Sequence, residues 1–219
     1  MMNENLTTMV LQPAKMMDSY LKKSAYLAIE RRLSEYEKLQ TAEQIAAYQE
    51  RMRGFFVRSL GGFPQKTLLN ARTVGVIPRY GYRIEKVIFE SQPQHYVTGN
   101  LYLPEGAGPH PGVLVPCGHS ENGKANEPYQ RACILLAGNG LAAFCYDPIG
   151  QGERKQILDA NGKGKYGCTV EHTMVGMGAI LLGTNTARYR IYDGIRALDY
   201  LVSREDIDPQ RIGCTGNSG

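Results

Sequence analysis

The segment Gly216-Asn217-Ser218-Gly219 places a serine between small residues, directly after a strand that we expect at 211–215. Glycines at such a strand-to-turn junction let the backbone fold tightly, so that the serine hydroxyl projects above the sheet. A hydroxyl in this position can act as a nucleophile when a neighbouring base removes its proton. Because a bare Gly-x-Ser also occurs in ordinary turns, the interpretation of Ser218 as a nucleophile depends on the elements around it.

Two backbone N–H groups are candidates for stabilising the negative charge that develops on an attacked carbonyl oxygen. One belongs to the residue after the serine, which is Gly219. The other is expected in the loop that follows the first buried strand, at 117–124, where the position favours the N–H of His119. The alternative for His119 is a loop histidine whose ring only braces the turn.

The elements that would position these groups change in character along the chain. Three short, turn-linked runs alternate and are rich in β-branched residues, and we expect them to pair as antiparallel strands: 72–77, 82–90 and 95–104. A strand–helix–strand–helix–strand pattern follows, at 112–116, 128–137, 141–146, 186–203 and 211–215. This order predicts parallel strands joined by right-handed crossovers, with a long loop before the second helix.

Residues 1–70 are predicted to form a helical N-terminal extension, and residues 71–219 the N-terminal part of the main domain. The segment 41–44 (Thr-Ala-Glu-Gln) matches a capping box, so a helix should begin near Ala42 and end at Gly61-Gly62. We expect the extension to pack on a core, and a cap over an active site is the alternative.

Composition excludes several classes of protein. The 219 residues include 42% hydrophobic and 21% charged residues, which is typical of a globular domain. The net charge of +4 comes without a Lys/Arg block, so we expect no nucleic-acid partner and no membrane partner. No apolar run approaches the roughly 20 residues of a membrane span, and no signal peptide is visible, which predicts a cytoplasmic protein. The five cysteines lack a CxxC pair. Four of them lie in apolar or Gly-rich strand and helix contexts and are interpreted as reduced, buried thiols rather than a disulfide framework or a metal site.

Charged residues near the expected loops are predicted to have structural roles. Asp147 follows a buried strand in an Asp-x-x-Gly-x-Gly loop, where it should accept backbone N–H bonds. Four further residues are expected to form ion pairs between this loop and the helix at 186–203, with contact to a substrate as the alternative: Arg154, Arg188, Arg190 and Asp193.

Residues 95–219 resemble the acetyl xylan esterase and dienelactone hydrolase branch of the α/β-hydrolase superfamily. The resemblance is carried by an ordered set of segments: 99–104, 111–115, 118–124, 146–154 and 208–219. It implies an α/β-hydrolase fold, with a mostly parallel sheet and helices on both faces, truncated after the nucleophile strand. It also implies a serine ester hydrolase without metal or cofactor, which forms an acyl-enzyme on Ser218. Cys117 is a departure, because this position is frequently His in the family.

The resemblance also implies a small ester substrate such as an acetylated sugar, and the sequence leaves an oligomer open. In this fold the catalytic residues follow the order Ser, acid, His, so the acid and the base are expected after residue 219. All four histidines precede Ser218, and using His172 as the base would break that order. Two alternatives stay open: an inactive fragment that acts as a binding or assembly module, or the same fold cleaving a lactone or a peptide bond.

Overall fold

The computed structural model describes residues 13–218. The chain divides into two compact units, the first ending at Phe56 and the second beginning at Val57. The predicted boundary at residues 70 and 71 lies further along the chain and stays a prediction. Within the described part, no helix combines the length and the apolar character that crossing a bilayer requires.

The first unit is built from α1 (Pro13–Tyr36) and most of α2 (Ala42–Ser59). The predicted capping box is confirmed at the start of α2. The backbone N–H of Gln44 donates to the Thr41 hydroxyl at 3.3 Å, and the N–H of Thr41 donates to the Gln44 carboxamide at 3.1 Å. These two bonds satisfy N–H groups that would otherwise lack partners at the helix end, so α2 begins at Ala42 as predicted.

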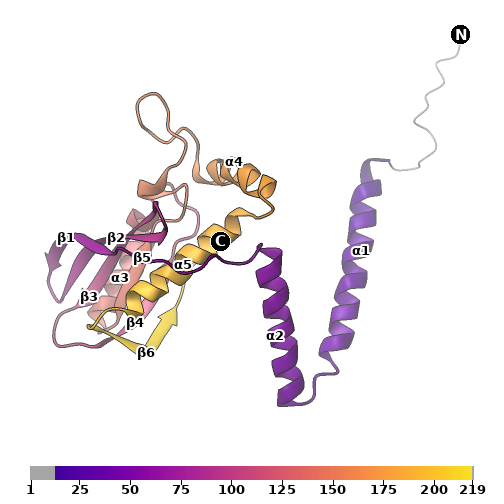
Figure 1. Ribbon diagram of the computed structural model, residues 1–219, viewed down its shortest axis with the longest axis horizontal. Helices are drawn as coiled ribbons and strands as arrows, with labels where there is room; N and C mark the ends of the chain where they lie inside the picture. Colours follow the sequence, from indigo (N-terminus) through magenta and orange to yellow (C-terminus); the bar gives the residue numbers. More distant parts are fainter. Residues whose placement is uncertain (1–12, 219) are drawn as a thin grey trace, which may run out of the picture. The chain divides into compact units, whose positions relative to one another are not determined.

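The second unit contains a six-stranded sheet with the order β1-β2-β3-β5-β4-β6 (Figure 1). Its strands are β1 (Arg72–Arg79), β2 (Tyr82–Gln92), β3 (His95–Pro104), β4 (His110–Pro116), β5 (Ala142–Tyr146) and β6 (Ile207–Cys214). Its helices are α3 (Glu127–Gly138), α4 (Cys168–Leu181) and α5 (Thr186–Val202), with short 3-10 turns η1 (Gly123–Ala125) and η2 (Gly152–Arg154).

The sheet is mixed, with antiparallel strands first and parallel strands after them, as the order of the predicted strands requires. Strand β4 pairs in parallel with β5 and β6, whereas the pairs β1/β2, β2/β3 and β3/β5 are antiparallel. The direction in which two strands pair depends on the segment that connects them. Tight turns reverse the chain between β1, β2 and β3, and only a returning helix allows a parallel neighbour.

Helices cover both faces of the sheet, as predicted. Helix α3 packs Tyr129 and Cys133 against one face, and α5 packs Ala197 and Leu201 against the other (Figure 1). Because β6 runs parallel to β4, α5 must return from the carboxyl edge of the sheet to its amino edge. The first turns of α5 therefore lie at the edge where β6 ends, which is where α/β sheets commonly bind ligands.

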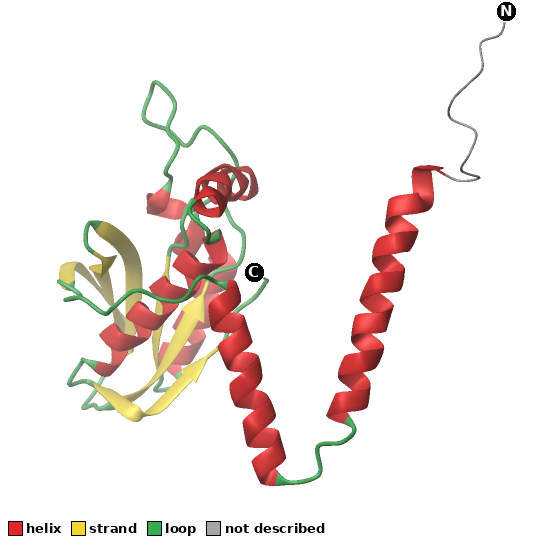
Figure 2. Ribbon diagram, turned by 45° about the vertical axis from the view of Figure 1, so that its right-hand side comes forward, coloured by secondary structure: helices red, strands yellow, loops and turns green. Residues whose placement is uncertain are grey.

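Helix α4 is absent from the sequence-based predictions, which place only a long loop between β5 and α5. Gly176 and Gly178 lower the helix propensity of this segment, and its first turn lacks a side-chain cap. The loop is limited to the segment between η2 and α4, and Figure 2 shows this segment extending away from the sheet. Leu158 and Gly164 form one isolated β-bridge within it.

Candidate active site at the end of β6

Ser218 has a backbone conformation that is costly for any residue except glycine. Its φ is +63°, in the left-handed region, and it follows β6 after a short extended segment. Non-glycine residues hold this conformation when the surrounding structure imposes it, and such positions cluster at functional sites. The sharp turn predicted around Ser218 is therefore present, while the role of Ser218 as a nucleophile stays a prediction.

The loop after β4 lies directly against this turn. A Cβ placed on Gly118 would lie 2.2 Å from the carbonyl oxygen of Asn217 and 2.6 Å from Cβ of Ser218. A Cβ on Gly216 would lie 2.9 Å from the carbonyl oxygen of Pro116. These separations leave no room for a side chain at Gly118. The structure thus brings together the serine and the loop that was predicted to stabilise the oxyanion.

Two buried side chains hold this loop in place. The N–H of Gly118 donates to the Tyr129 hydroxyl at 2.8 Å, and the Gln151 carboxamide donates to the carbonyl of Gly118 at 2.9 Å. No hydrogen bond within residues 13–218 engages the backbone N–H of His119. That group is consequently available to an outside acceptor, as the oxyanion prediction requires. Gly219, the other predicted donor, lies outside the described residues.

Tyr129 and Gln151 do not appear among the residues predicted from the sequence. Tyr129 comes from α3 and Gln151 from the loop after β5. The only sequence signal for Gln151 was its place in the Asp-x-x-Gly-x-Gly loop. The hydrogen bonds of both side chains join segments that are distant in the sequence, so they could not be predicted from it.

The ring of His119 is tied to α4 through His172. The Nε2 of His172 faces the carbonyl oxygen of Ile149, which can only accept, so this nitrogen carries the proton. Its Nδ1 then accepts a hydrogen bond from Nε2 of His119, at 3.1 Å. Burial lowers the pKa of His172, and the charge of Arg190 lowers it further. A neutral His172 therefore braces the loop, in keeping with the alternative stated for the ring of His119.

The Asp147 prediction is confirmed. One carboxylate oxygen accepts the N–H of Lys124 at 2.8 Å, and the other accepts the Thr98 hydroxyl at 2.8 Å and the N–H of Glu153 at 3.2 Å. The ammonium of Lys124 also contacts this buried carboxylate. Asp147 is fully buried among these partners, so it acts as a brace between loops.

The predicted ion pairs are confirmed for one pair and wrong for the other two arginines. Arg154 binds Asp193 at 2.8 Å, and both side chains are buried. Arg188 instead lies over the ring of Tyr189, 5.8 Å from its centroid. Arg190 forms no ion pair and no side-chain hydrogen bond within the described part of the chain.

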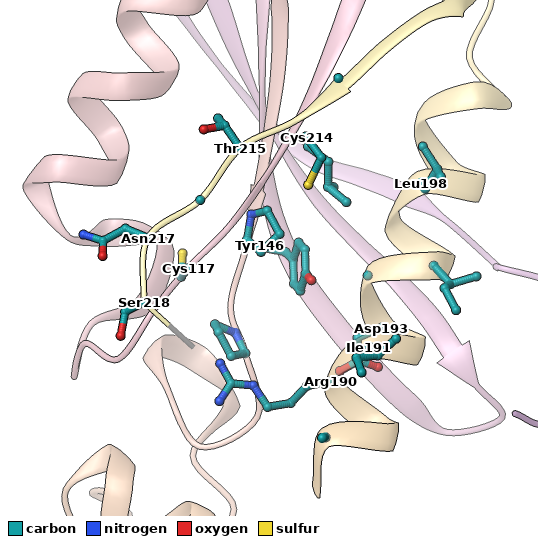
Figure 3. A pocket seen from close by; sticks show the side chains of 18 of the residues that line it. Cys117, Tyr146, Arg190, Ile191, Asp193, Leu198, Cys214, Thr215, Asn217 and Ser218 are labelled. Atoms are coloured by element: carbon teal, nitrogen blue, oxygen red, sulfur yellow. The ribbon is translucent and has the colours of Figure 1, made fainter. Parts of the chain in front are cut away.

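Arg190 and Ser218 line the same pocket, of about 890 Å³. Figure 3 shows Ser218 on one wall and α5 on the other, with the Arg190 side chain reaching from α5 across the pocket toward the Ser218 side. Most of the remaining lining is apolar: Leu114, Pro116, Cys117, Tyr146, Pro148, Ile191, Ile195, Leu198 and Ile212. The carboxylate of Asp193 also belongs to the lining. Within residues 13–218, no group of three His, Cys, Asp or Glu side chains is placed to hold a metal ion.

No protein-family profile matches the chain. It is 27% identical over 181 residues to YtaP of Bacillus subtilis, provisionally named a hydrolase, covering 77% of this chain and 56% of YtaP. A Bacteroides fragilis structure, provisionally named an acetyl xylan esterase, is similar with a TM-score of 0.68 and 21% identity, over 82% of this chain and 49% of that one. The methylesterase BT1017 is similar with a TM-score of 0.51 and 27% identity, over 77% of this chain and 33% of that one.

These likenesses, together with the sheet and its two helical layers, show that the chain has an α/β-hydrolase fold similar to that of acetyl xylan esterase structures. The chain spans about half the length of the relatives it matches, 56% of YtaP and 49% of the Bacteroides fragilis protein.

Proposed function

We propose that this α/β-hydrolase-fold protein is a serine carboxylic-ester hydrolase that acts on a small ester, such as an acetylated sugar, through an acyl-enzyme on Ser218. One observation carries the proposal. Ser218 is held at a φ of +63° at the end of β6, in direct contact with the loop at Gly118. A strained serine at the carboxyl edge of a parallel strand is the arrangement that exposes a nucleophilic hydroxyl.

The proposed reaction begins when Oγ of Ser218 loses its proton to a base and attacks the ester carbonyl. The carbonyl oxygen becomes an oxyanion, which the backbone N–H groups of His119 and Gly219 stabilise. When the C–O bond to the alcohol breaks, the alcohol leaves with a proton and the acyl group stays on Oγ. Water then attacks the acyl-enzyme, which releases the carboxylic acid and restores the serine.

We further propose that the base and its acid partner follow Ser218 along the chain. In this fold the order is Ser, acid, His, and the relatives are longer than this chain. His119 and His172 bond to one another, and neither ring is hydrogen-bonded to Ser218 within the described residues. Their arrangement therefore supports a role in bracing the loop.

The test is intact mass spectrometry of the natural full-length protein, which includes any residues that follow Ser218, before and after treatment with a fluorophosphonate. Attack by Oγ of Ser218 would form a Ser–O–P bond and release fluoride, giving one adduct per chain. We expect that adduct in the unmodified protein and none in Ser218→Ala. A folded protein that acquires no adduct would refute the proposal and favour the non-catalytic alternative.

A second variant, His172→Gln, tests the assignment of the base. Because His172 is proposed to act only through the loop, the variant should still be labelled at Ser218, at a lower rate. Complete loss of labelling in a folded His172→Gln protein would identify His172 as the base and overturn the proposed order.

A further inference from the structure

Arg190 is a partly buried cation that forms no ion pair and no side-chain hydrogen bond in the described structure, and Asp193 on the same helix attracts its charge only through space. Burial lowers the pKa of its guanidinium, which means that the pocket disfavours the charge. The guanidinium nevertheless stays charged at neutral pH, because an arginine pKa lies far above 7. A charge without a close counter-ion in a largely apolar pocket is costly unless a ligand supplies the opposite charge.

The carboxylates near this pocket form no ion pair with Arg190, although Asp193 lines the pocket and its Oδ1 has no hydrogen-bond partner in the described chain. Asp193, one helical turn from Arg190, is bound by Arg154 at 2.8 Å and lies 3.6 Å from Nε2 of His95. Glu171 on α4 is buried and accepts the N–H of Gln156 at 2.6 Å. Asp193 therefore attracts Arg190 only through space, while its short ion pair is with Arg154, and no carboxylate of the described residues lies within ion-pair distance of Arg190.

Arg190 also lies where a substrate would be. It belongs to the second turn of α5, and the first turns of α5 lie at the carboxyl edge of the sheet together with Ser218. Both residues line one pocket, and the Arg190 side chain extends toward the Ser218 wall (Figure 3). A group bound by the guanidinium would consequently belong to the same molecule as an ester held at Ser218.

We propose that Arg190 binds a carboxylate on the alcohol part of the substrate, so that the protein prefers esters of acidic sugars. The planar guanidinium matches a carboxylate with two parallel N–H···O bonds, which gives both affinity and orientation. A sugar acid presents this group on the same ring as an esterified hydroxyl. This inference rests on the proposed ester hydrolysis and specifies its substrate class.

The first experiment compares two esters that differ only in the carboxylate: O-acetylated methyl glucuronoside and O-acetylated methyl glucoside. We expect kcat/KM to favour the acidic ester, and Arg190→Gln to reduce this preference by roughly 10- to 100-fold, the worth of hydrogen bonds to a charged group. Arg188→Gln removes the same charge two residues away, outside the pocket lining, and should leave the preference unchanged.

The second experiment measures binding without catalysis, by calorimetry of methyl glucuronoside with Ser218→Ala protein. Adding Arg190→Gln should weaken binding of this acid by a similar factor, whereas adding Arg188→Gln should not. Methyl glucoside should bind weakly to all three proteins. An Arg190→Lys variant keeps the charge without the planar fork and should recover only part of the affinity.

The outcomes separate the two proposals. If no ester is cleaved but the acid binds through Arg190, ester hydrolysis fails and the carboxylate site stands. If esters are cleaved and Arg190→Gln leaves both the preference and the acid affinity unchanged, the carboxylate site is refuted and ester hydrolysis stands. Equal effects of Arg188→Gln and Arg190→Gln would also refute the site, because they would show a general effect of charge.

Discussion

Replacing Gly118 by alanine should separate the serine turn from the loop that is proposed to stabilise the oxyanion. The new Cβ would lie 2.2 Å from the carbonyl oxygen of Asn217 and 2.6 Å from Cβ of Ser218. Carbon atoms pack at about 3.5 Å or more, so the two segments must move apart by roughly 1 Å. A displacement of that size near reacting atoms costs about 100-fold in rate, and the overpacking should cost about 1–3 kcal/mol of stability.

The assay is the rate constant for fluorophosphonate labelling of Ser218, measured beside the denaturant midpoint of the same protein. Gly138→Ala is the matched control, because a Cβ at Gly138 meets nothing within 4 Å. The control should label at the normal rate and keep or slightly gain stability. A folded Gly118→Ala protein that labels within about twofold of the unmodified rate would refute the proposed contact between loop and serine.

Three further changes have expected outcomes. Asp147→Asn leaves the buried ammonium of Lys124 with only the exposed carboxylate of Glu153, and should cost about 3 kcal/mol in denaturant unfolding. Glu127→Gln, in an exposed pair, should change stability by less than about 0.5 kcal/mol. Ser218→Gly should be more stable than Ser218→Ala by about 1 kcal/mol, because only glycine adopts a φ of +63° without strain; equal stabilities would argue against the strained turn. The Lys155 ammonium and the N–H of Cys168 lower the pKa of Glu121 from 4.5 to about 2. The ionised Glu121 therefore stabilises the folded protein above pH 4.5, and this stabilisation disappears as the pH falls toward 2. Glu121→Gln should make the thermal midpoint decline less over this pH range, and an unchanged decline would contradict the assignment.

The strands were predictable from the sequence because their signals are local. Strand β3 has the predicted bounds, His95–Pro104, and the buried runs at β4 and β5 lie within two residues of the expected positions. Strand β6 was predicted less well. It begins at Ile207 because that residue and Asp208 pair with β4 before the register shifts. The sequence predicts a turn at these residues, because Asp-Pro is typical of turns. Their pairing with β4 could not be predicted, because it depends on a strand that is distant in the sequence.

The contacts of the site were less predictable, because they join distant segments. The bond between His119 and His172 requires α4, whose glycines conceal it in the sequence. Arg188 and Arg190 have the same side chain and lie two residues apart in α5, so the sequence alone predicted an ion pair for both. The rotation of α5 directs only Arg190 into the pocket, and that rotation depends on how the whole apolar face of the helix packs.

Several features that cost stability occur around this one pocket. Ser218 is strained, and Arg190 is charged without an ion-pair partner in the described chain. Four buried side-chain atoms of the described chain also lack a hydrogen-bond partner: Oε1 of Gln151, Oε2 of Glu171, Oδ1 of Asp193 and Nε of Arg196. Gln151 holds the loop at Gly118 and Asp193 lines the pocket, whereas both oxygens of the buried Asp147 carboxylate are hydrogen-bonded. Proteins retain such costs mainly where function requires them. A module that only bound a partner could use the free charge but would gain nothing from the strained serine, so their presence in one pocket favours catalysis on a charged ester.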